Sequence, residues 1–429
     1  MRSLILLIAV LPPLSLVAQD VPSAEKGSAE KGSAEKGSSE ISTALGEKGK
    51  VDHENSSQTT DKKDQTPLPN LDEVDWAMKS FVKDGVVSGA VTLVARDGKV
   101  VHLSGVGLSD LESEEVMKPN AIFSIASMTK PITATALMML EEEGKLSLDD
   151  KISKYIPAFA KLQLADGTVP EREITIRDAL THTSGLVGSQ SVQGSLQESV
   201  EQLAVRPLAF QPGEKWKYSP GLNVCGRIVE IVSGKPFEEF LQERIFEPLQ
   251  MNNTAFDLSK QQRRRLATLY GLAEDGKTLA AVDNRISDFA GSNGPSPSGG
   301  LVSTARDMFR FYAMVLAKGK FRGKRLLSPE SVKKMTELQT GDLETGFTPG
   351  NGWGLGWCLV QDPQDVTGML SSGTFGHGGA FGTQGWVDPN TRTIYVLMIQ
   401  RTKMGNSDGS LIRKAFQQAA VDALSKTGE

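Results

Sequence analysis

The spacing of apolar residues predicts that the ordered part of the chain begins near residue 71. One face of a helix is marked by four apolar side chains: Val74, Met78, Phe81 and Val82. Two β-type runs follow, at 89–96 and 99–106, and they flank Asp97-Gly98. Because Asp-Gly suits a type I′ turn, these runs are predicted to form a tight hairpin.

The far end of the chain has a similar pattern. Two further β-type runs, 383–387 and 393–400, flank a turn at 388–390. A closing helix is predicted from its apolar residues Leu411, Ile412, Ala415, Phe416, Ala419, Val421 and Leu424. Between these β-rich ends, residues 120–314 show helical patterns and loops rich in Gly and Pro. We therefore predict an α/β (α+β) fold, in which an antiparallel sheet from both termini is flanked by helices and carries a large, mostly helical insertion. Functional sites tend to form at such a seam.

The first 70 residues differ from the rest. Met1-Arg2 and the apolar run 4–17 have the charge and length of a secretory signal peptide, predicted over 1–18. Residues 19–70 contain Ser-Ala-Glu-Lys-Gly three times and few apolar side chains, so we expect a disordered low-complexity tether. The folded domain is predicted over 71–429. We expect an exported protein, periplasmic or secreted, with membrane contact only if the N-terminal segment is retained as an anchor.

Composition narrows the functional classes. The 429 residues carry a formal net charge of -5, which gives no general attraction to nucleic acid. Two cysteines, Cys225 and Cys358, provide no disulfide framework. Cys225 falls within an apolar helical series and is expected to be a buried free thiol. The four histidines have no ligand spacing, so neither a metal nor another cofactor is expected.

One short segment suggests nucleophilic catalysis. Ser127 and Lys130 are three residues apart at the start of a predicted apolar helix, so they share a face. A serine needs a base to attack a carbonyl at neutral pH, and a neighbouring lysine can supply one if its pKa is lowered. The same spacing recurs elsewhere, as at Ser331 and Lys334, so the tetrapeptide does not identify a nucleophile by itself.

Further segments complete a recognisable set. These are Phe-Ser-Ile-Ala-Ser-Met-Thr-Lys at 123–130, Thr-His-Thr-Ser-Gly-Leu at 181–186, Tyr-Ser-Pro at 218–220, Gly-Gly-Leu-Val-Ser-Thr at 299–304, Gly-Trp-Gly-Leu-Gly-Trp at 352–357 and His-Gly-Gly at 377–379. From about 71 to 425, the chain resembles the penicillin-recognising serine hydrolases of the class C β-lactamase group. That group includes D-alanyl-D-alanine carboxypeptidases and family VIII carboxylesterases, and it has a β-lactamase-like, transpeptidase-like fold.

The resemblance implies roles for individual residues. Ser127 would be the acylated nucleophile, Lys130 its first base, and Tyr218 the group that carries a proton to the leaving group. The backbone N–H groups of Ser127 and Ala380 would form the oxyanion hole. The substrate-binding strand would be His377, Gly378 and Gly379, against which the substrate lies as an added edge. His182 is expected to be structural, bonding loop backbone.

Two departures from the family pattern affect the expected substrate. Pro220 replaces the asparagine of Tyr-x-Asn, and His377 replaces the lysine of Lys-Thr-Gly. Both weaken the case for β-lactam hydrolysis, so we expect a carboxylesterase. A β-lactamase or D-alanyl-D-alanine carboxypeptidase remains the alternative, and the substrate is then a small-molecule ester, a β-lactam or a D-amino-acid peptide. Two hypotheses from other functional classes also remain. The protein could be a catalytically degenerate one that binds cell-wall peptide, or a filament-forming structural protein.

Overall fold

The computed structural model describes residues 70–282 and 294–426. The predicted signal peptide, and all of the predicted tether except its last residue, lie outside the described residues. The predicted boundaries of both segments therefore stay predictions.

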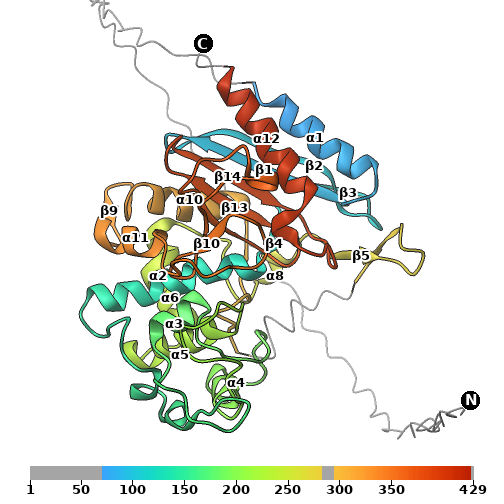
Figure 1. The fold of residues 1–429 in the computed structure, drawn as a ribbon. Helices are drawn as coiled ribbons and strands as arrows, with labels where there is room; N and C mark the ends of the chain where they lie inside the picture. The colour runs from blue at the N-terminus through green and yellow to red at the C-terminus, as the bar shows by residue number, and fades with distance from the viewer. Residues whose placement is uncertain (1–69, 283–293, 427–429) are drawn as a thin grey trace, which may run out of the picture. The chain divides into compact units, whose positions relative to one another are not determined.

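The centre of the fold is an eight-stranded antiparallel sheet with the strand order β10-β11-β12-β13-β14-β1-β2-β3 (Figure 1). Its strands are β1 Gly89–Arg96, β2 Lys99–Asp110, β3 Glu115–Val116, β10 Asn351–Trp353, β11 Cys358–Val360, β12 Phe375–Gly378, β13 Gln384–Asp388 and β14 Thr393–Met398. The N-terminal strand β1 pairs with the C-terminal strand β14, from Val91 opposite Met398 to Arg96 opposite Thr393. The prediction of an antiparallel sheet built from both termini is confirmed.

The predicted first hairpin is also confirmed. Arg96 of β1 pairs with Lys99 of β2, and both turn residues have left-handed backbone conformations, with φ 51° at Asp97 and 75° at Gly98. A type I′ turn requires positive φ at both central positions, which Asp and Gly accept more readily than β-branched residues do. The local sequence therefore fixes the register of this hairpin.

Helices cover both faces of the sheet, because alternate residues of each strand point to opposite sides. On β14, Tyr395 and Leu397 pack in the same core as residues of α1 (Asp72–Lys83) and α12 (Leu411–Ser425). Ile394, Val396 and Met398 point the other way and join the core of α10 (Ala305–Leu316). Helices α1 and α12 lie side by side on their face of the sheet (Figure 1).

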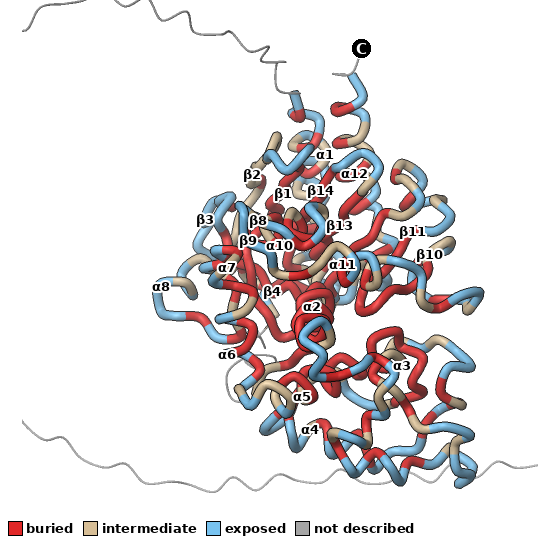
Figure 2. The backbone as a smooth tube through the Cα atoms, turned by 90° about the vertical axis from the view of Figure 1, so that its left-hand side faces the viewer, coloured by how far each residue is buried: buried red, intermediate tan, exposed pale blue. Residues whose placement is uncertain are grey.

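The segment between the two β-rich ends contains most of the remaining helices. These are α2 Thr129–Glu142, α3 Ile176–Thr181, α4 Leu196–Leu203, α5 Gly221–Ser233, α6 Phe237–Leu241, α7 Glu247–Leu249 and α8 Lys260–Arg263, and α11 Pro329–Thr336 follows α10. The 3-10 segments are η1 Ala126–Met128, η2 Ile152–Lys154, η3 Pro157–Lys161, η5 Asp365–Thr367 and η6 Ser407–Gly409, and η4 Gln242–Phe246 is a π-helical turn. Figure 2 shows α2 in red as a helix enclosed by its neighbours, and every residue from Thr129 to Leu140 is buried.

Three two-stranded sheets interrupt the mostly helical region or follow it. They pair β4 (Phe123–Ser124) with β7 (Val302–Ser303), β5 (Tyr270–Leu272) with β6 (Leu279–Ala281), and β8 (Lys320–Phe321) with β9 (Lys324–Arg325). The sequence did not predict them, because strands of two or three residues are too short to show an alternating pattern.

The structure also shows the state of the two cysteines and the character of the helices with respect to a membrane. Cys225 and Cys358 are free and buried, which confirms the prediction for Cys225. Within 70–282 and 294–426, no helix has the length and apolar character needed to cross a bilayer.

Candidate active site

The short strand β4 and the turn after it position Ser127. Phe123 and Ser124 pair with β7, and the N–H of Ile125 donates to Leu301 O at 3.0 Å. Ala126 then takes a left-handed conformation, with φ 42°, and η1 carries Ser127 before α2 begins at Thr129. Ser127 therefore lies in a 3-10 turn that leads into the helix, and the prediction that it opens the helix itself needs this small correction. Lys130 Nζ lies 3.2 Å from Ser127 Oγ.

Lys130 is enclosed, with no side-chain surface left to water. Its Nζ donates to Gln190 Oε1 at 2.7 Å and to the backbone O of Ser298 at 2.7 Å. The ring of Tyr218 covers it, with the centroid 4.6 Å from Nζ. Among the described residues, Lys130 forms no ion pair with a carboxylate. Burial therefore lowers the pKa of Lys130 well below its usual range.

The three oxygens around Lys130 Nζ can accept from a protonated amine, and they also suit the neutral amine that a lowered pKa makes available. An uncharged lysine has two N–H groups and one lone pair, and its two fixed acceptors, Gln190 Oε1 and Ser298 O, occupy both N–H groups. The lone pair is left for the hydroxyl proton of Ser127. A neutral Lys130 beside Ser127 can act as a general base, which a protonated lysine cannot.

Tyr218 lies just before α5 and is half-buried. Burial raises the pKa of its phenol, and a hydrogen bond with Ser127 opposes that shift. The phenol is therefore a neutral O–H donor at physiological pH. Its oxygen lies 3.5 Å from His377 Nε2. Tyr218 thus contacts the candidate nucleophile and base and faces the strand predicted to bind substrate.

His377 is the third residue of β12 and is 2% exposed. Its Nδ1 lies 2.6 Å from Gly378 O, a carbonyl that can only accept, so Nδ1 carries the proton and Nε2 keeps its lone pair toward Tyr218. Burial is the main cause that lowers the pKa of His377 to about 3. The imidazole is neutral throughout the usual working range, so this strand offers no cation at the position of the family's lysine.

Gly378 and Gly379 let β12 approach its neighbours closely. A side chain at Gly378 would overlap the carboxylate of Asp408, and one at Gly379 would overlap Thr383 and the carbonyl of Ile125. Thr383 Oγ1 also donates to Ile125 O at 3.3 Å, which ties the turn after β12 to the turn that carries Ser127. Ala380 is exposed in that turn. The oxyanion-hole role of the Ser127 and Ala380 amides stays a prediction.

The structure adds residues that sequence reasoning missed. Asn223 on α5 donates from Nδ2 to Gln190 O at 2.9 Å and accepts from Ser298 N at 2.9 Å through Oδ1. One buried amide therefore holds both partners of Lys130 in place. Asn223 lies off the apolar face of α5 that the sequence marks, so its burial could not be read from that pattern. No local pattern marked Gln190, which lies in a loop.

Aromatic rings surround Tyr218. The ring centroids of His182 and Phe347 lie 4.5 and 4.8 Å from its own, and Trp216 and Trp353 lie further out. His182 is fully buried, and its Nδ1 accepts from Ser219 N at 3.1 Å, which confirms its predicted structural role of bonding loop backbone. Phe347 is 40% exposed and gives this cluster an apolar edge open to solvent.

In the part of the chain that the structure describes, no group of three or more His, Cys, Asp or Glu residues is arranged to hold a metal ion. Around Ser127 the structure brings together a hydroxyl, a buried amine, a phenol and a neutral imidazole.

Comparison with known proteins identifies the family. The Beta-lactamase family model matches residues 74–420. Esterase EstB of Burkholderia gladioli is 30% identical over 371 residues, covering 79% of this chain and 92% of EstB. Penicillin-binding protein 4 of Amycolatopsis lactamdurans is 31% identical over 307 residues, covering 70% of this chain and 76% of that protein. The structure of EstCE1, a hydrolase with promiscuous acyltransferase activity, superposes with a TM-score of 0.69 at 24% identity, covering 82% of this chain and 97% of EstCE1.

The chain belongs to the β-lactamase family and is a serine hydrolase of that type. The likeness to EstCE1 adds that its fold is the β-lactamase-like one, as the sequence predicted. Family membership alone leaves the substrate open, since both an esterase and a penicillin-binding protein are among its relatives.

Proposed function

We propose that this protein is a carboxylesterase that acts through an acyl-enzyme on Ser127. The observation that carries the proposal is the neutral imidazole of His377, at the position where the family has a lysine. Nor does Pro220 supply a side-chain amide beside Tyr218. An ester without a carboxylate needs neither group, whereas a β-lactam or a peptide with a terminal carboxylate gains from a cation that binds it. The similarity to EstB supports the same choice.

The proposed acylation uses the contacts around Lys130. Ser127 Oγ bonds to the ester carbonyl carbon while its proton passes to the free electron pair of Lys130 Nζ. The carbonyl oxygen becomes an oxyanion held by the N–H groups of Ser127 and Ala380. As the bond to the alcohol breaks, the leaving oxygen takes a proton from Tyr218, and Lys130 returns its proton to Tyr218. The alcohol departs, and Ser127 is left as an ester.

Deacylation reverses these roles. Water attacks the acyl carbon and gives its proton to Tyr218 Oη, as Tyr218 gives its own proton to Lys130. The carboxylic acid leaves as Ser127 regains a proton, so acids and bases balance over one turnover. Burial raises the pKa of the phenol, so Tyr218 holds its own proton firmly and can give it to Lys130 only as it receives the proton from water. The ring of Tyr218 covers Lys130 Nζ, with 4.6 Å between Nζ and the ring centroid, and both side chains contact Ser127.

The substrate preference is directly testable. We expect purified full-length protein to hydrolyse p-nitrophenyl butyrate with a kcat/KM at least about 100-fold above that for nitrocefin or a D-alanyl-D-alanine peptide, a difference of roughly 2.7 kcal/mol in transition-state binding. Faster turnover of nitrocefin would make β-lactam hydrolysis the function, and faster turnover of the peptide would make it a carboxypeptidase. Failure of all three, together with no labelling by a fluorophosphonate, would favour the peptide-binding alternative.

We also propose export to the periplasm or the medium. The support is the charged start at Met1-Arg2 and the apolar run 4–17. Mass spectrometry of the protein from its producing cells should find a new N-terminus near residue 19 in the exported fraction. An intact Met1 in a soluble cytosolic fraction would contradict this.

A further inference from the structure

A cavity of about 480 Å³ lies between the end of α10, helix α11 and the start of β12. It shares no lining residue with the cluster around Ser127. Its volume falls in the range of small-molecule sites, roughly 300 to 1,000 Å³. The ten lining residues are Val315, Leu316, Lys318, Pro329, Glu330, Val332, Lys333, Thr336, Phe375 and Pro389.

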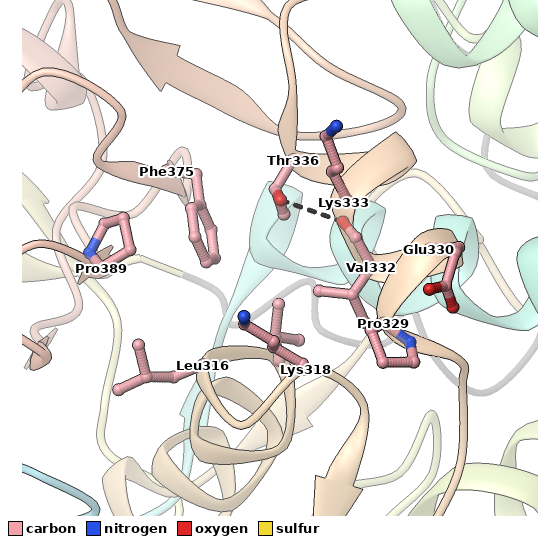
Figure 3. A pocket seen from close by; sticks show the side chains of 10 residues that line it. Leu316, Lys318, Pro329, Glu330, Val332, Lys333, Thr336, Phe375 and Pro389 are labelled. Atoms are coloured by element: carbon pink, nitrogen blue, oxygen red, sulfur yellow. Dashed lines mark hydrogen bonds between the residues drawn. The ribbon is translucent and has the colours of Figure 1, made fainter.

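The walls are mainly apolar and fixed in place. Val315, Val332 and Phe375 belong to the main core and are at most 5% exposed. The hydroxyl proton of Thr336 is already used within the helix, because Oγ1 donates to Val332 O at 2.9 Å (Figure 3). The apolar part of a ligand in this cavity would therefore be buried against apolar side chains.

One charged group faces this space. Lys318 is exposed and lines the cavity, and Figure 3 shows its ammonium on the side of Phe375 and Val332, whereas the charged ends of Lys333 and Glu330 point away. The backbone of Lys318 is held at both ends, since its N–H donates to Val315 O at 2.9 Å and its carbonyl accepts from Arg325 Nη1 at 3.0 Å. Throughout 70–282 and 294–426, no carboxylate pairs with the Lys318 ammonium.

We propose that this cavity binds an amphipathic carboxylate, with its hydrocarbon part between α10 and α11 and its charged group at Lys318. The charge of Lys318 excludes a cationic head group. The lining contains no arginine and only one inward lysine, which fits a singly charged carboxylate better than a phosphate. The proposal does not depend on esterase activity, because none of the residues used for catalysis lines the cavity.

Titration calorimetry of the full-length protein with decanoate tests the proposal. We expect saturable binding of decanoate, and weaker binding of decyltrimethylammonium. Lys318→Met should weaken decanoate binding about threefold to fivefold, since a partly exposed ion pair contributes up to about a factor of five. Lys320→Met is the matched control, because Lys320 is an exposed lysine of β8 that does not line the cavity, and it should leave the affinity unchanged.

A second variant separates binding in this cavity from binding elsewhere. Leu316 is half-buried and lines the cavity, so Leu316→Trp should obstruct part of the space and weaken decanoate binding more than Lys318→Met does, while the protein keeps its circular dichroism spectrum and thermal midpoint. Equal affinities in wild type, Lys318→Met and Leu316→Trp would overturn the proposal. So would loss of decanoate binding when Ser127 is blocked by a fluorophosphonate, because the ligand would then occupy the catalytic site.

Discussion

Ser127→Ala should lower the kcat of p-nitrophenyl butyrate hydrolysis by about 10⁴-fold or more and abolish labelling by a fluorophosphonate. The substitution removes only the hydroxyl, whose partners are Lys130 and Tyr218. Without it, no covalent intermediate forms, and the residual rate is that of water in the same site. Steady-state kinetics and the intact mass of the labelled protein measure both effects.

The chain supplies a matched control in another Ser-x-x-Lys pair, Ser331 and Lys334 on α11. Ser331 Oγ donates to Glu142 Oε2 at 2.7 Å, and Lys334 Nζ pairs with Glu141 Oε1 at 2.7 Å. Each member of this pair is engaged by its own carboxylate, so Ser331 and Lys334 do not make the contact that Ser127 and Lys130 make. Ser331→Ala should therefore keep wild-type labelling. Labelling that survives Ser127→Ala would place the nucleophile elsewhere.

Lys130→Met should lower kcat/KM by about 10²- to 10⁴-fold, because the variant keeps the volume of the side chain and loses the base. Lys130→Arg should be as inactive, since a guanidinium does not give up its proton at working pH. Lys334→Met, the corresponding change on α11, should cost no comparable activity. An active Lys130→Arg enzyme would mean that Lys130 serves as a cation, and the proposed base would be wrong.

The pH dependence gives an independent measure of the same role. A lowered pKa for Lys130 means that kcat/KM should rise with pH as the amine loses its proton and then level off. His377 titrates near pH 3, so it does not cause this rise of kcat/KM with pH, which we call the rising limb of the profile. Gln190→Glu would place a carboxylate beside Nζ, raise the pKa of Lys130, and move the limb to higher pH by about one unit or more. A limb that stays in place would show that another group controls it.

Local patterns predicted much of the fold correctly. The hairpin turn at Asp97-Gly98 depends on backbone conformations that those two residues favour, and the helices α1 and α12 depend on apolar spacing. These features depend on neighbours in the chain and can be read without a structure. The position of Ser127 in a 3-10 turn ahead of α2 was missed, because the pairing of β4 with β7 that sets this turn joins residues about 180 apart.

The amino-acid sequence determined which groups are available: a Ser-x-x-Lys pair, a tyrosine before α5, and a His-Gly-Gly strand in the order of the β-lactamase family. Only the tertiary structure decided which pair can react. Ser127-Lys130 and Ser331-Lys334 have the same spacing, but folding removes Lys130 from water and gives it two neutral acceptors, whereas Lys334 stays part-exposed with a carboxylate partner. The burial that lowers the pKa of Lys130 and the carboxylate partner of Lys334 both arise from contacts between distant segments of the chain.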